Sequence, residues 1–300
     1  MSGNDHMSSR RSILPQSWPW LLRCPRVELR HGPRTLIMGI LNVTPDSFSD
    51  GGKFLDPAAA VDRGLGIAEE GADIIDVGGE STRPTAEDVS AEEEILRVVP
   101  VIEALAKKTR VPISVDTRKS AVAKRAIDAG AQIINDISAL HHDPAMLGVA
   151  VRAGTPVVLM HMRGAPATMQ QDTRHENLLG EIEDYFLDAV NDCLKAGLGY
   201  DQIVLDPGIG FAKTAEQNLE ILANLGRLVE LRFPLMLGVS RKSFIGRILD
   251  LPADERLEGT AAAVAACILE GARIVRVHDV REMARVAKVC DAIRSMRYRG

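Results

Sequence analysis

No part of this chain is apolar over the roughly 20 residues that a membrane-spanning helix needs. The Ala-rich segment around Val264–Leu269 is short and stops at Glu270. Positive charge is not in excess either, since 36 Lys and Arg residues stand against 41 Asp and Glu and the net charge is -5. We therefore expect no membrane partner and no nucleic-acid partner.

Cysteine is scarce, and no two cysteines are spaced as a Cys-x-x-Cys pair. The four are Cys24, Cys193, Cys267 and Cys290. The last three fall in predicted helices, where free buried thiols are expected. This usage argues against a disulfide framework and a zinc site, and it favours the reducing cytoplasm.

The first 20 residues carry no regular strand or helix pattern, and we expect residues 1–20 to form a disordered tail. Arg10-Arg11 would suit a twin-arginine export signal, but Pro15 and Pro19 interrupt the segment that would have to be apolar. Residues 21–300 contain no repeat and no Gly/Ser-rich linker, so they are expected to form a single domain.

What the chain does contain is a series of eight short apolar runs, each followed by polar residues or glycine. The runs are Leu36–Leu41, Ile74–Val77, Ile113–Val115, Ile133–Ile134, Val157–Met160, Ile203–Leu205, Leu235–Val239 and Ile274–Val277. Helical patterns fill the intervals, and parallel strands buried on both faces have this continuous apolar character. We therefore predict an α/β fold, a (β/α)8 TIM barrel whose chemistry lies at the C-terminal ends of the strands.

Three local features refine this fold. Residues 21–35 are expected to form a short N-terminal β-hairpin, with Val27-Glu28-Leu29 alternating and His31-Gly32-Pro33-Arg34 as the turn. One helix is expected over residues 215–228. The loops after the first two strands, Asn42–Asp56 and Gly78–Ser90, are long and polar, and we interpret them as lids rather than as solvated surface.

Asp116, Asn135 and Asp206 each follow a different strand, so their side chains are expected to meet at one pocket mouth. Inward carboxylates are costly unless donors pair with them, and a pterin or purine edge offers adjacent N–H donors. The amide of Asn135 both donates and accepts, which suits a mixed heterocycle edge. Helix capping is the alternative for each residue taken alone.

Cationic side chains follow the last two strands. Ser240-Arg241-Lys242-Ser243 ends the seventh, while Arg276 and His278 lie on one face of the eighth. Barrels often bind phosphate at this place, next to a short extra helix such as Ser243–Leu249. The pattern predicts an anion site, with surface salt bridges as the alternative.

Two further polar positions allow more than one interpretation. Asn42 could give one oxygen ligand to magnesium beside a bound phosphate, or it could be a turn residue in Asn42-Val43-Thr44-Pro45. His161 ends the fifth strand, and His141-His142 lies in a loop. Their spacing fits a shared zinc ion poorly, so packing or surface roles are favoured.

The longest motifs resemble signatures of the dihydropteroate synthases. They are Met38–Gly52 (MGILNVTPDSFSDGG), Asp76–Pro84 (DVGGESTRP), Ile113–Thr117, Ile134–Asp136, Leu205–Phe211, Ser240–Ser243 and Arg276–Val280. They occur in family order over about residues 36–290. One departure is Thr85-Ala86-Glu87-Asp88-Val89, where the family often has glycine soon after the proline.

The resemblance implies that 6-hydroxymethyl-7,8-dihydropterin diphosphate and 4-aminobenzoate condense to 7,8-dihydropteroate and diphosphate in folate biosynthesis. It implies that the pterin is held by Asp116, Asn135, Asp206 and Lys242. It implies that the diphosphate is held by Asn42, Arg276 and His278. Lys242, Arg276 and His278 would be the catalytic residues, and Asn42 would also bind the Mg2+ cofactor.

The resemblance also implies roles for the two lids. Thr82 and Arg83 would approach the substrate on closure. The aminobenzoate slot, where sulfonamides compete, would be shaped by Phe48, Pro84, Lys242 and Ser243. The family is usually dimeric, so a homodimer is expected.

Two other functions compete with this interpretation. A methyltetrahydrofolate:corrinoid methyltransferase shares the barrel and the pterin-holding acids, but it needs neither two lids nor a diphosphate site. A catalytically silent pterin-binding paralogue would be expected to have lost lid or diphosphate residues, and every assigned position is present here.

Overall fold

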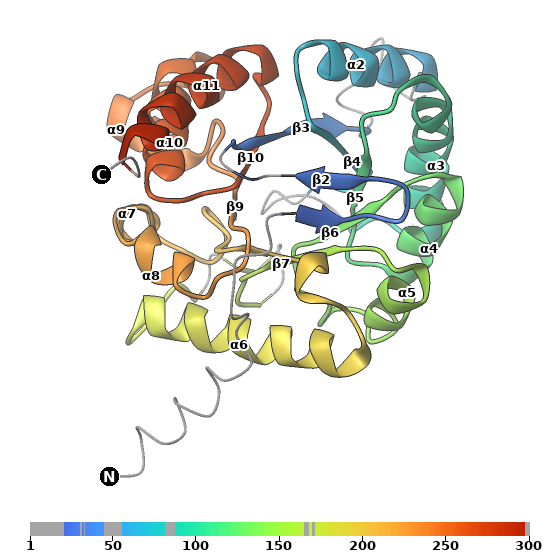
Figure 1. Cartoon of the computed structure of the whole chain (residues 1–300), viewed down its shortest axis with the longest axis horizontal. Helices are drawn as coiled ribbons and strands as arrows, with labels where there is room; N and C mark the ends of the chain where they lie inside the picture. Colours follow the sequence, from blue (N-terminus) through green and yellow to red (C-terminus); the bar gives the residue numbers. More distant parts are fainter. Residues whose placement is uncertain are drawn as a thin grey trace.

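Eight parallel strands lie side by side in the order β8-β7-β6-β5-β4-β3-β10-β9, and a parallel bridge between Leu205 and Leu235 joins the two ends of the sheet. The strands are β3 (Leu36–Asn42), β4 (Ile74–Gly78), β5 (Ile113–Asp116), β6 (Ile133–Asp136), β7 (Val157–Met160), β8 (Ile203–Asp206), β9 (Met236–Leu237) and β10 (Ile274–Val277). This nearly closed ring, seen in Figure 1, confirms the predicted (β/α)8 barrel. The computed structural model describes residues 21–30, 32, 34–44, 56–81, 88–164, 168–169 and 172–297.

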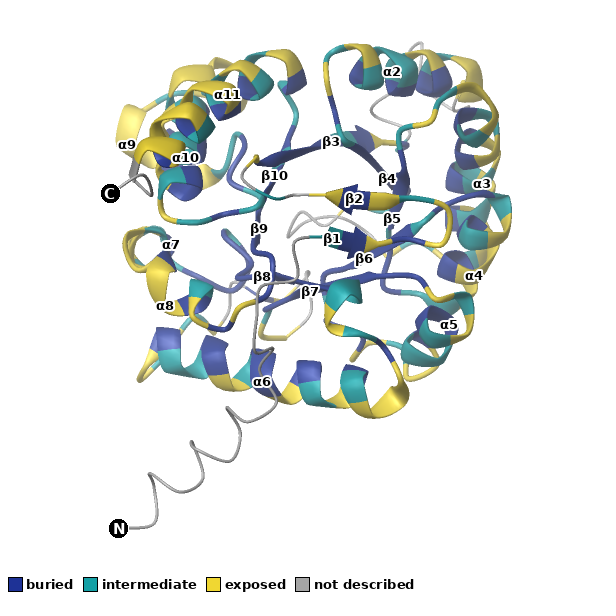
Figure 2. Cartoon of the chain, viewed as in Figure 1, coloured by how far each residue is buried: buried dark blue, intermediate teal, exposed yellow. Residues whose placement is uncertain are grey.

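Helices surround the strand ring. They are α2 (Pro57–Glu69), α3 (Ala91–Lys108), α4 (Ser120–Ala129), α5 (Met146–Ala153), α6 (Leu178–Ala196), α7 (Ala215–Ala223), α8 (Leu225–Val229), α9 (Ser243–Leu249), α10 (Leu257–Leu269) and α11 (Val280–Arg297). Of these, α2, α3, α6 and α7 each begin at a residue whose side chain caps the first turn. Ser90 caps α3 by accepting from the backbone N–H of Glu93, at 3.1 Å. Figure 2 shows the helices burying their inner faces against the ring and exposing their outer faces.

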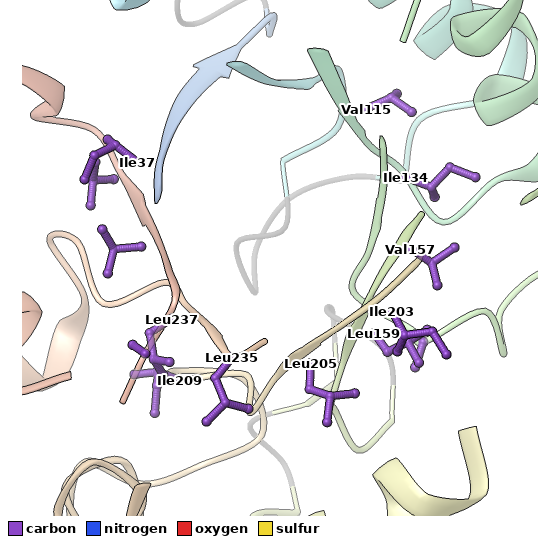
Figure 3. Close-up of a cluster of buried hydrophobic side chains, with 14 of the residues drawn as sticks. Ile37, Val115, Ile134, Val157, Leu159, Ile203, Leu205, Ile209, Leu235 and Leu237 are labelled. Atoms are coloured by element: carbon purple, nitrogen blue, oxygen red, sulfur yellow. The ribbon is translucent and has the colours of Figure 1, made fainter. Parts of the chain in front are cut away.

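The main apolar core lies between the strands and the helices. Figure 3 shows side chains such as Val115, Ile134 and Leu205 on the outer side of the strand ring. A second cluster, which includes Leu36 and Ile74, fills the inside of the ring. Because both faces of the strands are covered, the runs of Val, Ile and Leu are continuous. All four cysteines are free and buried, which confirms the prediction made for Cys193, Cys267 and Cys290 and adds Cys24 to them.

A short antiparallel hairpin precedes the barrel, pairing β1 (Leu21–Arg23) with β2 (Glu28–Arg30). The hairpin was predicted, but its turn is at Cys24–Val27, where the Cys24 N–H donates to the Val27 carbonyl at 3.0 Å. The predicted turn at 31–34 therefore does not join the two strands of the hairpin. The alternating residues 27–29 predict a strand but do not show which neighbour it pairs with. In the structure this strand pairs with the residues before it, not with those after it.

The hairpin closes the N-terminal end of the barrel. Leu22 and Leu29 belong to one buried cluster with the first residues of four strands, Leu36, Ile74, Ile133 and Ile274. Figure 1 shows β1 and β2 lying across the opening of the ring. The opposite end, where the strands finish, is therefore the end that can receive a ligand.

Truncating the hairpin plug should destabilise the fold. Leu22 is 1% exposed, so Leu22→Ala should lower the free energy of unfolding by about 3 kcal/mol through lost transfer energy and a cavity. Leu96, which is 74% exposed, provides the control, because Leu96→Ala should change little. Urea unfolding of both variants checks this, and equal effects would show that the hairpin is only loosely attached.

Other sequence predictions have mixed outcomes. The helix expected over 215–228 is two helices, because Asn224 has non-helical backbone angles and bonds with its side chain to the Glu220 carbonyl.

Most of the first long loop and the centre of the second, residues 45–55 and 82–87, lie outside the described residues, as does the predicted tail over 1–20. Within the part of the chain that is described, no helix is long and apolar enough to cross a membrane.

Candidate active site

The predicted site residues gather at the C-terminal end of the barrel. Asp116, Asn135 and Asp206 end or nearly end β5, β6 and β8. The N-caps of the helices that follow these strands are Lys119, Ala145 and Thr214. Helix capping therefore does not explain the three Asx residues, and the pocket interpretation remains.

Arg276, on β10, lies between two aspartates. Its Nε donates to Asp76 Oδ2 and its Nη2 donates to Asp116 Oδ2, each at 2.6 Å. Asn135 Nδ2 donates to the same Asp76 oxygen at 3.0 Å. One polar network thus joins β4, β5, β6 and β10. Asp76 is 0% exposed, and its Oδ1 has no hydrogen-bond partner among the described residues, so the network can still accept a donor.

Burial sets the protonation of the two site aspartates. It raises the pKa of Asp116 to about 7, against the opposing effect of Arg276 and with a further rise from Asp76. Burial also raises the pKa of Asp206, whose Oδ1 accepts the Gly208 N–H at 2.8 Å. These carboxylates are held in a site that disfavours their charge, and N–H donors of a ligand would relieve that cost.

Lys242 lies opposite these acids. Burial lowers its pKa to about 8, with a further lowering by the charge of Arg276, whereas Asp206 and Asp116 raise it. Its Nζ is 4.3 Å from the centre of the Phe211 ring, a cation–π distance. A planar ligand held by Asp206 would therefore find an aromatic ring and an ammonium group near its face.

The turn that carries Lys242 is fixed by hydrogen bonds and an ion pair on the side away from the acids. Arg241 has a φ of +58°, and its N–H donates to Thr260 Oγ1 at 3.0 Å. Its guanidinium pairs with Asp279 at 2.6 Å. Arg256 Nη1 donates to the Arg241 carbonyl at 2.9 Å. Of the predicted cations, Arg241 is thus a salt-bridge residue, while Lys242 and Arg276 face the acids.

His278 follows β10 and contacts Ser240, with 3.0 Å between His278 Nδ1 and Ser240 Oγ. Burial lowers its pKa to about 4, helped by Arg276 and Arg241. His278 is therefore neutral near pH 7 in the ligand-free protein. It can offer a hydrogen bond to an anion, while the positive charge comes from Arg276 and Lys242.

Asn42 and Ser243 lie exposed at the rim, at the end of β3 and the start of α9. Phe48, Thr82, Arg83 and Pro84 lie outside the described residues. The described ends of the second loop are tied together by Arg118, which donates to Glu80 at 3.3 Å and to Asp88 at 2.6 Å. These bonds hold the two described ends of the loop, Glu80 and Asp88, next to Arg118.

Sequence reasoning missed Asp76 as a site residue. It lies inside the run Ile74–Val77 and is the first residue of the motif Asp76–Pro84, but neither pattern led to a role for its side chain. A single carboxylate in an otherwise apolar run was the available signal, because such a charge needs a partner from another element. His161, favoured for packing, is buried, and its ring meets the Tyr185 ring edge-on at 4.9 Å.

The chain matches the family described as "Pterin binding enzyme" over residues 38–278. The match spans every strand that contributes to the site except the first residues of β3. The chain therefore belongs to the family of pterin-binding enzymes.

Relatives narrow the class further. A dihydropteroate synthase from Synechocystis sp. is 51% identical over 263 residues, covering 87% of this chain and 91% of that protein. One from Bacillus subtilis is 49% identical over 265 residues, covering 88% and 90%. A crystal structure of the Yersinia pestis dihydropteroate synthase with a sulfonamide drug has a TM-score of 0.87 at 42% identity, covering 92% of this chain and 99% of that one. Within the pterin-binding family, this chain belongs with the dihydropteroate synthases.

Proposed function

We propose that this chain joins 6-hydroxymethyl-7,8-dihydropterin diphosphate to 4-aminobenzoate, a transferase reaction of folate biosynthesis. The C–O bond between the pterin methylene and the diphosphate breaks, and a C–N bond to the aryl amine forms as that amine loses a proton. The products are 7,8-dihydropteroate and diphosphate. The observation that carries the proposal is the hydrogen-bonded network of buried Asp76 and Asn135 with partly buried Asp116 and Arg276 at the open end of the barrel.

The pterin would be recognised by its donors. Its ring N–H and amino groups pair with the carboxylates of Asp116 and Asp206, while Asn135 meets the mixed part of the edge. Lys242 and Phe211, which contact each other at 4.3 Å, would lie near the face of the pterin ring. These contacts orient the methylene carbon, and orientation of the reacting centre supplies a large part of the rate.

Arg276 would serve both the acids and the diphosphate. Without ligand it neutralises Asp76 and Asp116. When pterin donors take over Asp116, the Nη2 arm of the guanidinium becomes free to bind the diphosphate, with Lys242 and His278 beside it. As the diphosphate leaves, positive charge grows on the methylene carbon, and the carboxylates stabilise it electrostatically.

Magnesium is the proposed cofactor. Asn42 would supply one amide oxygen at the rim, and the other ligands would be diphosphate oxygens and water. Among the described residues no cluster of three or more His, Cys, Asp or Glu side chains is placed to hold a metal, which suits a cation held mainly by the substrate. When bound, magnesium neutralises leaving-group charge.

The second substrate would occupy a slot beside Lys242 and Ser243, with Phe48 and Pro84 from the lids. The Xanthomonas albilineans dihydropteroate synthase, 41% identical with a TM-score of 0.86 over 93% of this chain and 99% of that one, was solved with 4-aminobenzoic acid. The Yersinia pestis structure holds a sulfonamide. We propose that the two ligand classes compete for this slot here.

We also propose that the chain is a homodimer in the cytoplasm. Exposed apolar side chains gather on α9, α10 and α11, which Figure 1 shows together on one side of the barrel. They are Ile248, Leu249, Leu257, Val289, Ile293 and Met296. An apolar patch of this kind is typical of a protein interface. Sedimentation equilibrium should give twice the chain mass, and a monomer at micromolar concentration would contradict this.

The proposal is tested by mixing the purified protein with the dihydropterin diphosphate, 4-aminobenzoate and magnesium, and detecting 7,8-dihydropteroate. Product that is lost when a chelator is added supports the reaction and the metal. Binding of the diphosphate ester without product would favour a silent paralogue. If the protein neither binds the ester nor forms product, methyl transfer to a corrinoid protein would be tested next.

Pterin affinity should depend on pH through Asp116. Its pKa of about 7 means that the carboxyl gains a proton as the pH falls and then loses acceptor capacity. Between pH 8 and pH 6 the ionised fraction falls about tenfold, and the affinity for a phosphate-free pterin should fall by about the same factor. Calorimetry at both pH values checks this, and Asp116→Asn should flatten the dependence. An equally steep dependence in Asp116→Asn would assign it to another group.

A further inference from the structure

Lys213, in the loop between β8 and α7, is a buried cation surrounded by neutral acceptors. It is 3% exposed. Its Nζ lies 3.0 Å from His161 Nδ1 and 3.0 Å from the Phe211 carbonyl. The Gly208 carbonyl is at 3.2 Å and the His161 carbonyl at 3.4 Å. Its three protons are thus used within the loop and on the end of β7.

An ammonium group in this position is costly. Burial lowers the pKa of Lys213 to about 7, and Lys242 adds repulsion while Asp206 attracts. An apolar side chain of similar length would fill the same space without that cost. Any benefit of a lysine at position 213 must therefore come from the hydrogen bonds that its ammonium group donates.

Two of these bonds reach the residues that shape the pterin side of the site. The Gly208 N–H fixes Asp206 by donating to its Oδ1 at 2.8 Å. Gly208 itself has a φ of +68° and touches the end of β7, since an added Cβ would lie 2.1 Å from the His161 carbonyl. Phe211 places its ring 4.3 Å from Lys242 Nζ. One ammonium group thus connects the supports of Asp206 and Lys242.

The His161 ring completes the arrangement. Because an ammonium group only donates, Nδ1 of His161 must accept, so the ring is neutral with its proton on Nε2. Burial and the charge of Lys213 lower the pKa of His161 to about 2, which agrees with a neutral ring. His161 also receives support from Tyr185, whose ring it meets edge-on. The ring is thus a fixed acceptor that anchors Lys213 to β7.

We infer that Lys213 is a positioning residue for the pterin: it holds the Gly208–Phe211 loop in the shape in which Asp206 and Phe211 grip the ring. This inference rests on the proposed function. Of the aminobenzoate slot, Lys213 is connected to Lys242 alone, indirectly through Phe211, and its bonds reach neither Ser243 nor the turn at Arg241. Losing the ammonium group should therefore affect the two substrates unequally.

The test compares Lys213→Met, which keeps the length and removes the donors, with Lys195→Met on the exposed side of α6 as the control for loss of one lysine. Calorimetry with 6-hydroxymethylpterin should show about 30-fold weaker binding for Lys213→Met and no change for Lys195→Met. The KM for 4-aminobenzoate in Lys213→Met should stay within about threefold. Added ethylammonium should restore pterin affinity in Lys213→Ala.

A purely structural role would give a different result, namely a smaller fraction of active protein with an unchanged dissociation constant, and this would overturn the inference. If Lys213→Met does not fold, His161→Phe decides, because it keeps a ring and removes the acceptor. About fivefold weaker pterin binding is expected there, and unchanged binding would overturn the inference. A wild-type chain that does not bind the pterin would contradict the proposed function, and the inference with it.

Discussion

Replacing Asp206 by alanine should weaken binding of a phosphate-free pterin by about a hundredfold, equivalent to about 3 kcal/mol. The carboxylate is buried at the end of β8, so the pterin donors that it would accept from have no water to replace it. Isothermal titration calorimetry with 6-hydroxymethylpterin measures the effect directly. Asp206→Asn keeps the shape and one acceptor oxygen, so its pterin affinity should fall less than that of Asp206→Ala.

Stability gives the control for this variant. Burial raises the pKa of Asp206, so the charged carboxylate is disfavoured in the folded protein at pH 7. Asp206→Ala should therefore leave the melting temperature of the ligand-free protein unchanged or raise it while affinity collapses. Asp192→Ala, on the exposed side of α6, should change neither property. Unchanged pterin affinity in Asp206→Ala would remove this residue from the site.

Arg276→Met should have the second large effect, and it should act on activity and stability together. Turnover should fall by about a hundredfold to a thousandfold, because a fixed cation beside the leaving diphosphate is lost. The free energy of unfolding should fall by about 3 kcal/mol at pH 8, because the carboxylates of Asp76 and Asp116 lose their partner. Initial rates and urea unfolding measure the two effects.

The pH dependence of that loss has a definite sign. The folded pKa of Asp116 is already raised, and removing Arg276 raises it further, so the penalty is greatest above the folded pKa. As the pH falls below it, the folded protein takes up a proton that the unfolded chain does not yet bind, and stability recovers. Asp76→Asn in the Arg276→Met background should restore part of the stability. A loss independent of pH would mean that packing, not charge, is responsible.

The sequence was sufficient to predict the barrel because the same pattern, an apolar run followed by a helical segment, recurs eight times along it. The run Val157–Met160 is a buried strand with the predicted bounds, and a strand covered on both faces is expected to be apolar throughout. The hairpin turn and the break at Asn224 were not predicted, because each depends on which neighbour a short segment pairs with. Such pairings are tertiary contacts that a local pattern does not encode.

In the site, too, the positions of residues were predictable from the sequence, whereas the contacts between them were not. Position after a strand was enough to predict that Asp116, Asn135, Asp206, Lys242 and Arg276 meet at one end of the barrel. It could not predict that Arg276 spans two aspartates, because side-chain pairing across strands depends on the registers of β10 with β3, of β3 with β4 and of β4 with β5. Lys213 escaped notice because a lysine in a loop is usually solvent-exposed, and only the folded chain shows what surrounds it.

The most direct test of the account is a rate measurement that follows both products at once. Wild-type protein with dihydropterin diphosphate, 4-aminobenzoate and magnesium should form 7,8-dihydropteroate and diphosphate in equal amounts. Lys242→Ala should abolish both, while Lys195→Ala, on the exposed side of α6, should leave them unchanged. Diphosphate release without dihydropteroate, or full activity in Lys242→Ala, would contradict the proposed site.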